Sequence, residues 1–542
     1  MTTENEVPES TTPGSGGQPQ RLSGQRLIAK TSVVSGMTLV SRILGLVRDV
    51  VFARFFGASF VMDAFLVANR IPNMLRRFFA EGAFSQGFVP VMARYRERYD
   101  HEDAREFVDS VAGTFGLILF LVTLAGVIAA PLLVAVVAPG FIGQDGRFEL
   151  ATLMLRFTFP YLFFVSLTAF AGGILNTYGR FGVPAFTPVI LNVVLIAAAI
   201  WLAPTLEEPG MALAYAVFVA GVCQLLFQVP FLMRIRALPR PKWGLHHEGV
   251  RRVTRLMLPA IFGSSVAQIN VLLGGIIASM LGVGKISLLY YSDRLMEFPL
   301  GLFGIALATV TLPYLARQAA NESHDEFADT LDWSMKLVLL IAVPAAIGLI
   351  VLAEPLVATI FFGGVFTATD VELTALALQA FAIGLVGFSY IKILAPAYFA
   401  REDTKTPVRV GLIALAVNFV LSVTLAWYLT RIGFEGTHAG LALAISIAAL
   451  LNAWLLYRGL RRDGVARHGS GWPWLLGRVS IANVAMWVVL AQMQRPGIWW
   501  LEVGIIDRIS WLSVSIVVGA FTYFLVLFIL GMRLGDFRLR QS

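Results

Sequence analysis

The chain has 542 residues, of which 57% are hydrophobic and only 14% are charged, and its formal net charge is +8. A soluble domain carries about 25% charged residues, so this composition excludes an ordinary soluble protein. Cys223 is the only cysteine, which excludes an internal disulfide and a cysteine-based metal cluster. We therefore expect an integral membrane protein.

The first 25 residues are polar and rich in Pro, Gly, Ser and Thr, which predicts a disordered cytoplasmic tail. Beyond this tail, apolar stretches long enough to cross a bilayer recur to the end of the chain. They show no polar alternation, which favours helices over a barrel. The sequence thus predicts an all-α polytopic membrane protein of about fourteen transmembrane helices. The expected spans lie near 31–57, 62–93, 109–137, 150–175, 184–203, 210–233, 256–282, 287–316, 337–361, 374–398, 410–430, 438–457, 472–493 and 509–532.

Lysine and arginine are distributed unequally between alternate connections of these spans. One side holds 28 of them and the other side holds six. The positive-inside rule then places both termini in the cytoplasm and makes the number of spans even. Because these charges occupy short loops rather than one folded face, we expect no nucleic-acid partner.

Two segments of the chain resemble each other at a nearly constant offset. ANRIPNMLRRFFAEGAFSQGFVPVMAR (68–94) parallels SDRLMEFPLGLFGIALATVTLPYLAR (292–317). Six spans fit in each unit, so the repeat predicts two lobes in parallel orientation with a substrate site between them. The predicted regions are an N-lobe at 26–240, a C-lobe at 241–465, and two appended helices with a short cytoplasmic end at 466–542. The matched residues are Arg70 with Arg294, Pro90 with Pro313 and Arg94 with Arg317, at offsets of 223 or 224.

Eight basic residues remain inside the predicted spans. Each costs about 2.5–3.5 kcal/mol at a helix centre on insertion scales, so each must face protein or water. Arg42 and Arg48 lie deepest, with only Asp49 close by, whereas the others have acidic neighbours or lie near an interface. The basic residues are Arg42, Arg48, Arg70, Arg76, Arg77, Arg156, Arg294 and Lys392. The acidic residues that could form ion pairs or gates with them are Asp49, Asp63, Glu81, Asp293 and Glu297.

The excess of arginine indicates an anionic cargo. A guanidinium donates two parallel hydrogen bonds, which suits phosphate better than a point charge does. No GxxxxGK[ST] motif occurs, and the histidines fall in predicted loops without metal spacing, so we expect neither ATP hydrolysis, a metal nor a cofactor.

Three blocks of the sequence resemble the MurJ (MviN) lipid II flippases of the MOP exporter superfamily. They are SRILGLVRDVVFARFFGASFVMDAFLVANRIPNMLRRFFAEGAFSQGFVPVMARY (41–95), SDRLMEFPLGLFGIALATVTLPYLA (292–316) and ILAPAYFAREDTKTPV (393–408). The resemblance spans roughly 30–460. It implies two six-helix lobes, two extra helices along a groove for a polyprenyl tail, and transfer of undecaprenyl-linked peptidoglycan precursor across the bacterial cytoplasmic membrane. It also implies lipid II as the cargo, and membrane lipids and the cell-wall synthesis machinery as partners.

The same resemblance implies roles for individual residues in the substrate cavity. The motifs show which residues of this chain correspond to the family's cavity arginines and cavity-lining residues, and none of these core positions departs from the family pattern. The long N-terminal tail does depart from that pattern. The implied cavity residues are Arg42, Arg48, Arg76, Arg294, Asp63, Ser287 and Ala53. Ion-pair or gate roles are left to Asp49, Arg70, Arg77, Glu81, Asp293 and Glu297.

Other functions remain open on the residues alone. A relative of the same fold could export another polyprenyl-linked oligosaccharide or a drug, although a cationic drug would need acidic groups where this chain has arginines. An intramembrane enzyme would need a histidine or paired carboxylates beside the arginines. A scaffold without transport would have no reason to keep charges in the bilayer.

Overall fold

The computed structural model shows a helical protein. Within the residues that it describes there is no β-strand, and an isolated bridge joins Gly363 to Phe366. In lipid, a chain satisfies its backbone N–H and C=O groups only in helices or in a closed barrel, and the continuous apolar runs of this sequence favour helices. The predicted all-α class is confirmed. The described residues are 24–77, 83–98, 100–144, 146–321, 323–466 and 471–533.

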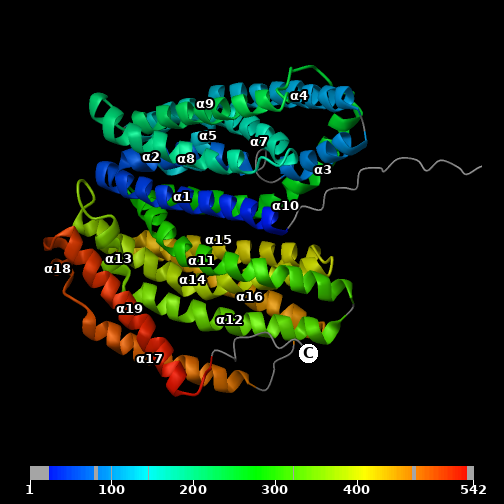
Figure 1. Cartoon of the computed structure of the whole chain (residues 1–542). Coiled ribbons are helices and arrows are strands. Elements are labelled where there is room, and N and C mark those ends of the chain that lie inside the picture. The colour runs from blue at the N-terminus through cyan, green and yellow to red at the C-terminus, as the bar shows by residue number, and fades with distance from the viewer. Residues whose placement is uncertain are drawn as a thin grey trace, which may run out of the picture.

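Helices α1 to α9 form a first bundle, which occupies the upper half of Figure 1. Two expected spans are broken, one at Ala129 and one at Pro160. A proline lies at or just after each break, where it cannot continue the ladder of hydrogen bonds. The bounds are α1 Gly24–Phe56, α2 Phe60–Arg76, α3 Ala83–Arg98, α4 His101–Ile128, α5 Ala130–Val137, α6 Arg147–Thr158, α7 Tyr161–Thr177, α8 Gly182–Ala197 and α9 Met211–Arg234.

Helices α11 to α16 form a second bundle in the lower half of Figure 1, and α17 to α19 lie along its far edge. Helix α10 lies between the bundles and packs on α3 of the first and α15 of the second. Residues 235–247, which we call the linker, join α9 to α10. The bounds are α10 Glu248–Ser279, α11 Lys285–Ala320, α12 His324–Val351, α13 Ala353–Ile360, α14 Ala368–Ala400, α15 Lys405–Arg431, α16 Thr437–Arg462, α17 Trp472–Met493, α18 Gly497–Glu502 and α19 Ile505–Ile529.

The repeat in the sequence has a counterpart in the broken helices. Helices α4 and α12 both have 28 residues, and α5 and α13 both have 8. Each helix of the second pair begins 223 residues after its counterpart, which is the offset of the matched arginines and prolines. The equal lengths and equal offset support a duplicated unit. The division into two lobes of six spans each stays a prediction.

The charged helices are distinct from the apolar ones. Ten helical segments in the described part of the chain are long and apolar enough to cross a membrane. The expected spans that are not among them correspond to α1, to α2 with α3, to α10 and to α11. All of the proposed cargo arginines lie on α1, α2 and α11. The coarse prediction of a multi-span membrane protein is confirmed, and the number fourteen stays a prediction.

Small residues allow close packing inside the second bundle. A Cβ on Gly384 of α14 would lie 2.6 Å from Ser446 Oγ on α16, and a Cβ on Gly387 would lie 2.7 Å from the backbone nitrogen of Leu450. Helices in lipid associate through such close contacts, because no hydrophobic effect drives them together. Ser446 also donates a hydrogen bond to the Ala380 carbonyl at 2.7 Å. This packing holds α14 closely against α16, and α14 also packs against α11.

Candidate functional site

The first charge cluster is centred on Asp49 of α1, whose exposed fraction is 2%. Arg48 Nη2 donates to Asp49 Oδ1 at 2.7 Å, and the Tyr290 hydroxyl of α11 donates to the same oxygen at 2.7 Å. Arg294 Nε, one turn further along α11, lies 3.6 Å from Asp49 Oδ2. One carboxylate therefore joins two arginines that come from the two bundles. We call these four residues the Asp49 cluster.

Asn192 on α8 completes the coordination of Arg48. Its side-chain oxygen accepts from Arg48 Nη1 at 3.1 Å, while its nitrogen donates to the Ser41 carbonyl of α1 at 3.1 Å. Arg48 also donates from Nη2 to the Tyr290 hydroxyl at 3.0 Å. The guanidinium is thus held by partners on α1, α8 and α11, and its orientation is fixed.

Arg294 is the more accessible arginine of the pair. Its side chain is 38% exposed, compared with 15% for Arg48. Nη1 donates to Glu297 Oε2 at 2.9 Å, and the guanidinium lies 5.0 Å from the centre of the Tyr290 ring. Neighbouring Asp293 lies within electrostatic reach of Arg77 on α2. Glu297, with a side chain that is 52% exposed, is the more accessible of the two carboxylates beside Arg294, since that of Asp49 is 3% exposed.

Arg42 of α1 also contacts α11, at a different position along the two helices from the Asp49 cluster. Its side chain is exposed, and its Nη1 lies 2.5 Å from where a Cβ on Gly301 of α11 would be. Lys392 of α14 lies nearby, with Nζ 3.4 Å from the Leu300 carbonyl. Positive charges from α1 and α14 therefore flank α11 at this level.

The second cluster is centred on Asp63 of α2, which is 0% exposed. Arg147 Nη2 of α6 lies 3.0 Å from Oδ2, and the Gly284 N–H donates to the same oxygen at 2.7 Å. Ser287 of α11 donates to Oδ1 through both its N–H at 2.9 Å and its hydroxyl at 2.7 Å. Asp63 thus caps the N-terminus of α11, where free N–H groups and the helix dipole favour a negative charge. We call these four residues the Asp63 cluster.

Several of the cavity residues that the sequence analysis grouped together lie in different parts of the structure. Asp63 and Ser287 are 0% exposed and bonded to protein groups within the Asp63 cluster, and Ala53 of α1 is 0% exposed within the hydrophobic core. Arg42, Arg48 and Arg294 gather at and beside the Asp49 cluster. The predicted contact of Asp63, Ser287 and Ala53 with a substrate stays a prediction.

The remaining predicted residues lie on α2 or next to it. Arg70 packs against Gly275 of α10, and its buried Nη1 has no hydrogen-bond partner among the described residues. Arg76 Nε donates to Asn73 at 3.2 Å, and Arg77 is exposed. Glu81 lies outside the described residues.

One expectation about the titratable groups was wrong. Arg48 is paired with Asp49, the acidic neighbour that the sequence offered, and Arg42 is exposed on the protein, so the depth of the two arginines in the membrane stays a prediction. No histidine was expected inside a helix, yet His438 is the second residue of α16, is 0% exposed, and bonds the Leu373 carbonyl at 2.9 Å. The span boundary drawn from hydropathy began at His438 itself, so the error arose at the helix end.

Sequence reasoning also missed Arg147 and Tyr290, which belong to the clusters, and Asn192, which holds Arg48. Arg147 was assigned to a loop, because the pattern gives no sign that it folds back onto Asp63. Tyr290 and Asn192 are uncharged and lie in apolar runs. The only signal in the sequence that they could be functional was a polar group inside a predicted membrane span. Arg147 is 3% exposed, which shows how completely the fold encloses it.

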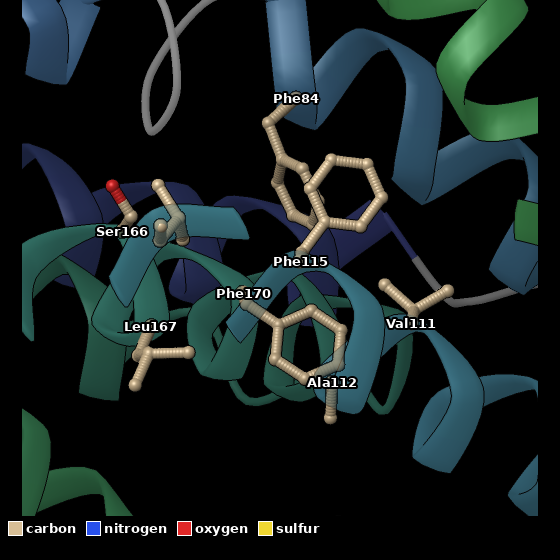
Figure 2. Close-up of a pocket in the computed structure, with 8 residues that line it drawn as sticks. Phe84, Val111, Ala112, Phe115, Ser166, Leu167 and Phe170 are labelled. Carbon is tan, nitrogen blue, oxygen red and sulfur yellow. The ribbon is translucent and has the colours of Figure 1, made fainter. Parts of the chain in front are cut away.

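A small apolar pocket lies elsewhere in the first bundle. Figure 2 shows Phe84, Val111, Phe115, Ser166 and Phe170 lining it, from α3, α4 and α7. No charged residue contributes to its wall, so it offers nothing to an anionic cargo. Among the described residues, no group of three or more His, Cys, Asp or Glu side chains is placed to hold a metal ion.

Comparisons with known proteins agree on one family. The family model described as "Lipid II flippase MurJ" matches residues 52–504. The chain is 46% identical to a "Probable lipid II flippase MurJ" of Vibrio cholerae, over 95% of this chain and 98% of the relative. It is 42% identical to a "Lipid II flippase MurJ" of Burkholderia cenocepacia, over 94% of this chain and 98% of the relative.

Solved structures show the same fold. A structure titled "Lipid II flippase MurJ, inward closed conformation" matches with a TM-score of 0.74 at 26% identity, covering 92% of this chain and 98% of that one. An inward-facing multidrug resistance MATE family transporter of the MOP superfamily matches with a TM-score of 0.62 at 16% identity, covering 80% of this chain and 98% of that one. The second likeness concerns the fold alone.

Proposed function

Because this chain belongs to the lipid II flippase MurJ family, we propose that it moves lipid II from the inner to the outer leaflet of the bacterial cytoplasmic membrane. It acts as a transporter and not as an enzyme. The observation that carries the proposal for the cargo site is the Asp49 cluster, in which Arg48 and Arg294 of different bundles meet on one carboxylate. Arginines from both sides of a central site suit a pyrophosphate, which needs several charge-assisted hydrogen bonds at once.

In the proposed loaded state, phosphate oxygens replace Glu297 at Arg294. The Arg294–Glu297 pair is exposed, so breaking it costs little, about 0–1 kcal/mol. Arg42 and Arg76 add positive charge along the approach on α1 and α2. Arg48 keeps its bonds to Asn192 and Tyr290 and acts as a fixed donor, while Arg294 exchanges its partner.

The Asp63 cluster is proposed as the lock that closes the outer side. Asp63 comes from the first bundle, and the N-terminus of α11 that it caps comes from the second. Opening outward requires these hydrogen bonds to break, which exposes Asp63, Ser287 and Ala53 to the cavity. Alternating access then consists of closing this lock on one side and opening the other, with both termini in the cytoplasm.

Helices α17 and α19 are proposed to guide the polyprenyl tail. They are held on the second bundle by side chains that bond to backbone carbonyls: Tyr523 to Leu340 at 2.8 Å and Gln494 to Val351 at 2.6 Å. Phe521 and Phe524 are more than half exposed on the other face of α19. This anchorage leaves an apolar surface in contact with lipid while the headgroup crosses between the bundles.

A flippase or exporter for another cargo is the alternative. The MATE-like fold would fit a drug exporter, but the central charges on α1 and α11 are arginines, which repel cationic drugs. Another polyprenyl-linked oligosaccharide would carry the same pyrophosphate, so only the sugar and peptide would distinguish it from lipid II.

The test is complementation of a flippase-depleted strain combined with a leaflet-resolved assay of lipid II. Arg48→Ala, Arg42→Ala and Arg294→Ala should each leave lipid II in the inner leaflet at normal protein level, and Arg294→Lys should be partly defective, because its bidentate geometry is lost. Arg431→Ala, on an exposed outer end of α15, is the matched control and should complement fully. Full growth of the Arg42 and Arg48 variants at native expression would contradict the proposal.

A further inference from the structure

The linker between α9 and α10 is held in place along α4. The N–H groups of Arg240 and Lys242 donate to the side chain and the carbonyl of Asp109, at 2.6 and 3.0 Å. The N–H of Gly244 donates to Thr114 Oγ1 at 3.1 Å. Asp109 and Thr114 are both buried. The linker backbone is therefore fixed to the first bundle by groups that are themselves enclosed.

Its side chains point away from the protein. Leu238, Trp243 and Leu245 are 40%, 61% and 43% exposed. In Figure 1 the linker is the green trace that passes over the outer side of α4. Helix α4 is one of the apolar membrane-spanning segments, from Glu102 to Ile128. The exposed Trp and Leu side chains therefore lie beside the N-terminal half of a helix that is long and apolar enough to cross a membrane.

The end of α9 and the linker are also basic. Arg234, the last residue of α9, and Arg236, Arg240 and Lys242 of the linker are exposed, and no acidic residue occurs between 234 and 247. Within the described part of the chain, none of these four forms an ion pair. Some basic residues of other connections do have acidic partners: Arg401 lies 3.2 Å from Asp463, and Lys336 lies 2.6 Å from Asp332. The linker cations have no such partner among the described residues, so their charge is available to an anionic ligand.

Backbone strain marks one of these basic positions. Arg236, two residues after the end of α9, has a φ of 54°, in the left-handed region that glycine usually occupies just after a helix C-terminus. A side chain there costs free energy that a glycine would avoid. The chain keeps a cation at that position despite the cost.

We propose that the linker is a membrane-surface site that binds anionic phospholipid headgroups of the cytoplasmic leaflet. Trp243 and the two leucines enter the interface, where amphipathic rings are stabilised, and the four basic side chains meet the headgroup phosphates. Because Asp109 and Thr114 fix the linker on α4, the bound lipid anchors the first bundle. The inference goes beyond the cargo site, which lies on other helices.

The experiment uses the full chain reconstituted in nanodiscs. Cys223 is the only cysteine, so Cys223→Ser with Leu245→Cys gives one attachment point for an environment-sensitive dye. The probe lipids are phosphatidylcholine alone and phosphatidylcholine titrated with phosphatidylglycerol. We expect the emission to shift to the blue as phosphatidylglycerol is added, and the shift to weaken at high salt.

The paired variant Arg240→Gln with Lys242→Gln should weaken the apparent affinity for phosphatidylglycerol by about tenfold or more, since each surface cation contributes to lipid attraction. Arg461→Gln with Arg462→Gln removes two exposed charges from the end of α16 and is the matched control, which should leave the shift unchanged. Equal emission in both bilayers, or an equal loss in the control, would overturn the proposal and favour a protein partner for this surface. All four substituted residues are exposed, so folding should be unaffected.

Discussion

Two carboxylates on consecutive helices show how one membrane protein uses buried charge in two ways. Asp63 accepts hydrogen bonds from Arg147, Gly284 and Ser287, and every one of these groups is enclosed by protein. Asp49 is equally buried, but its partner Arg294 is 38% exposed and shares its charge with Glu297. The first cluster is closed on all sides, whereas the second has one side that solvent or cargo can reach.

The difference follows from the kind of group that each carboxylate bonds. The Asp63 cluster uses the N–H groups at a helix start, which cannot rotate away, so the carboxylate is held rigidly. The Asp49 cluster uses long side chains, which can change partners without moving a helix. A rigid cluster suits a lock between bundles, and an exchangeable cluster suits a binding site. Four substitutions test this contrast.

Asp63→Ala should have the largest effect on stability. It leaves the buried Arg147 guanidinium without its carboxylate and the N-terminus of α11 uncapped, which should lower the free energy of unfolding by about 3–5 kcal/mol. Thermal unfolding of the purified protein measures this loss. Asp370→Ala, which removes an exposed cap of α14, is the control and should cost only about 1 kcal/mol. Equal losses for both variants would remove the distinction between a lock and an ordinary cap.

Asp49→Asn should affect transport more than stability. Tyr290 can still donate to the amide oxygen, so the free energy of unfolding should fall by only about 1–3 kcal/mol. Arg48 and Arg294 lose the charge that joins them, and transport of lipid II should stop. Complementation and protein level measured together separate the two effects. A variant that grows normally would show that the Asp49 cluster is dispensable.

Glu297→Gln should strengthen cargo binding. It removes the exposed carboxylate that competes with phosphate for Arg294, so the affinity for lipid II should rise about two- to fivefold with little change in stability. Binding to the purified protein, titrated with lipid II, gives the ratio. Glu326→Gln, at an exposed position on α12, should leave affinity unchanged. Weaker binding in the Glu297 variant would mean that this carboxylate positions Arg294 rather than competing for it.

Tyr290→Phe should have the smallest effect. It deletes the hydroxyl that bonds Asp49 and Arg48 but keeps the ring that Arg294 contacts, so the free energy of unfolding should change by about 1 kcal/mol. Tyr290→Ala also removes the ring and should cost more. If the two variants unfold at the same temperature, the ring contributes nothing to holding Arg294.

The sequence was informative about properties that are visible in a short stretch of residues. A charge inside an apolar run is costly, and this cost alone directed attention to Arg42, Arg48, Asp49 and Arg294. The sequence repeat also has a counterpart in the structure, because α4 and α12 begin 223 residues apart and have equal lengths. Class and helical spans were predictable for the same reason, because lipid permits few alternatives.

The pairings were not predictable, because they depend on the tertiary fold. Nothing local to Arg147 indicates that it meets Asp63, which precedes it by 84 residues. Tyr290 and Asn192 carry no charge and look like ordinary members of an apolar helix. The boundaries of α1 and α16 also shifted from the expected ones, since hydropathy changes gradually where a helix enters the interface.

The order in which the cluster residues are synthesised has a consequence for insertion. Arg48 and Asp49 are neighbours on α1, and Asp63 and Arg147 both precede the second bundle. Each of these two acidic groups thus has a basic partner that leaves the ribosome before α11 does, so both carboxylates can be neutralised before the second bundle is made. Arg294 then arrives at a carboxylate that is already in place. Assembly of the Asp49 cluster therefore adds one late cation to a prepared site.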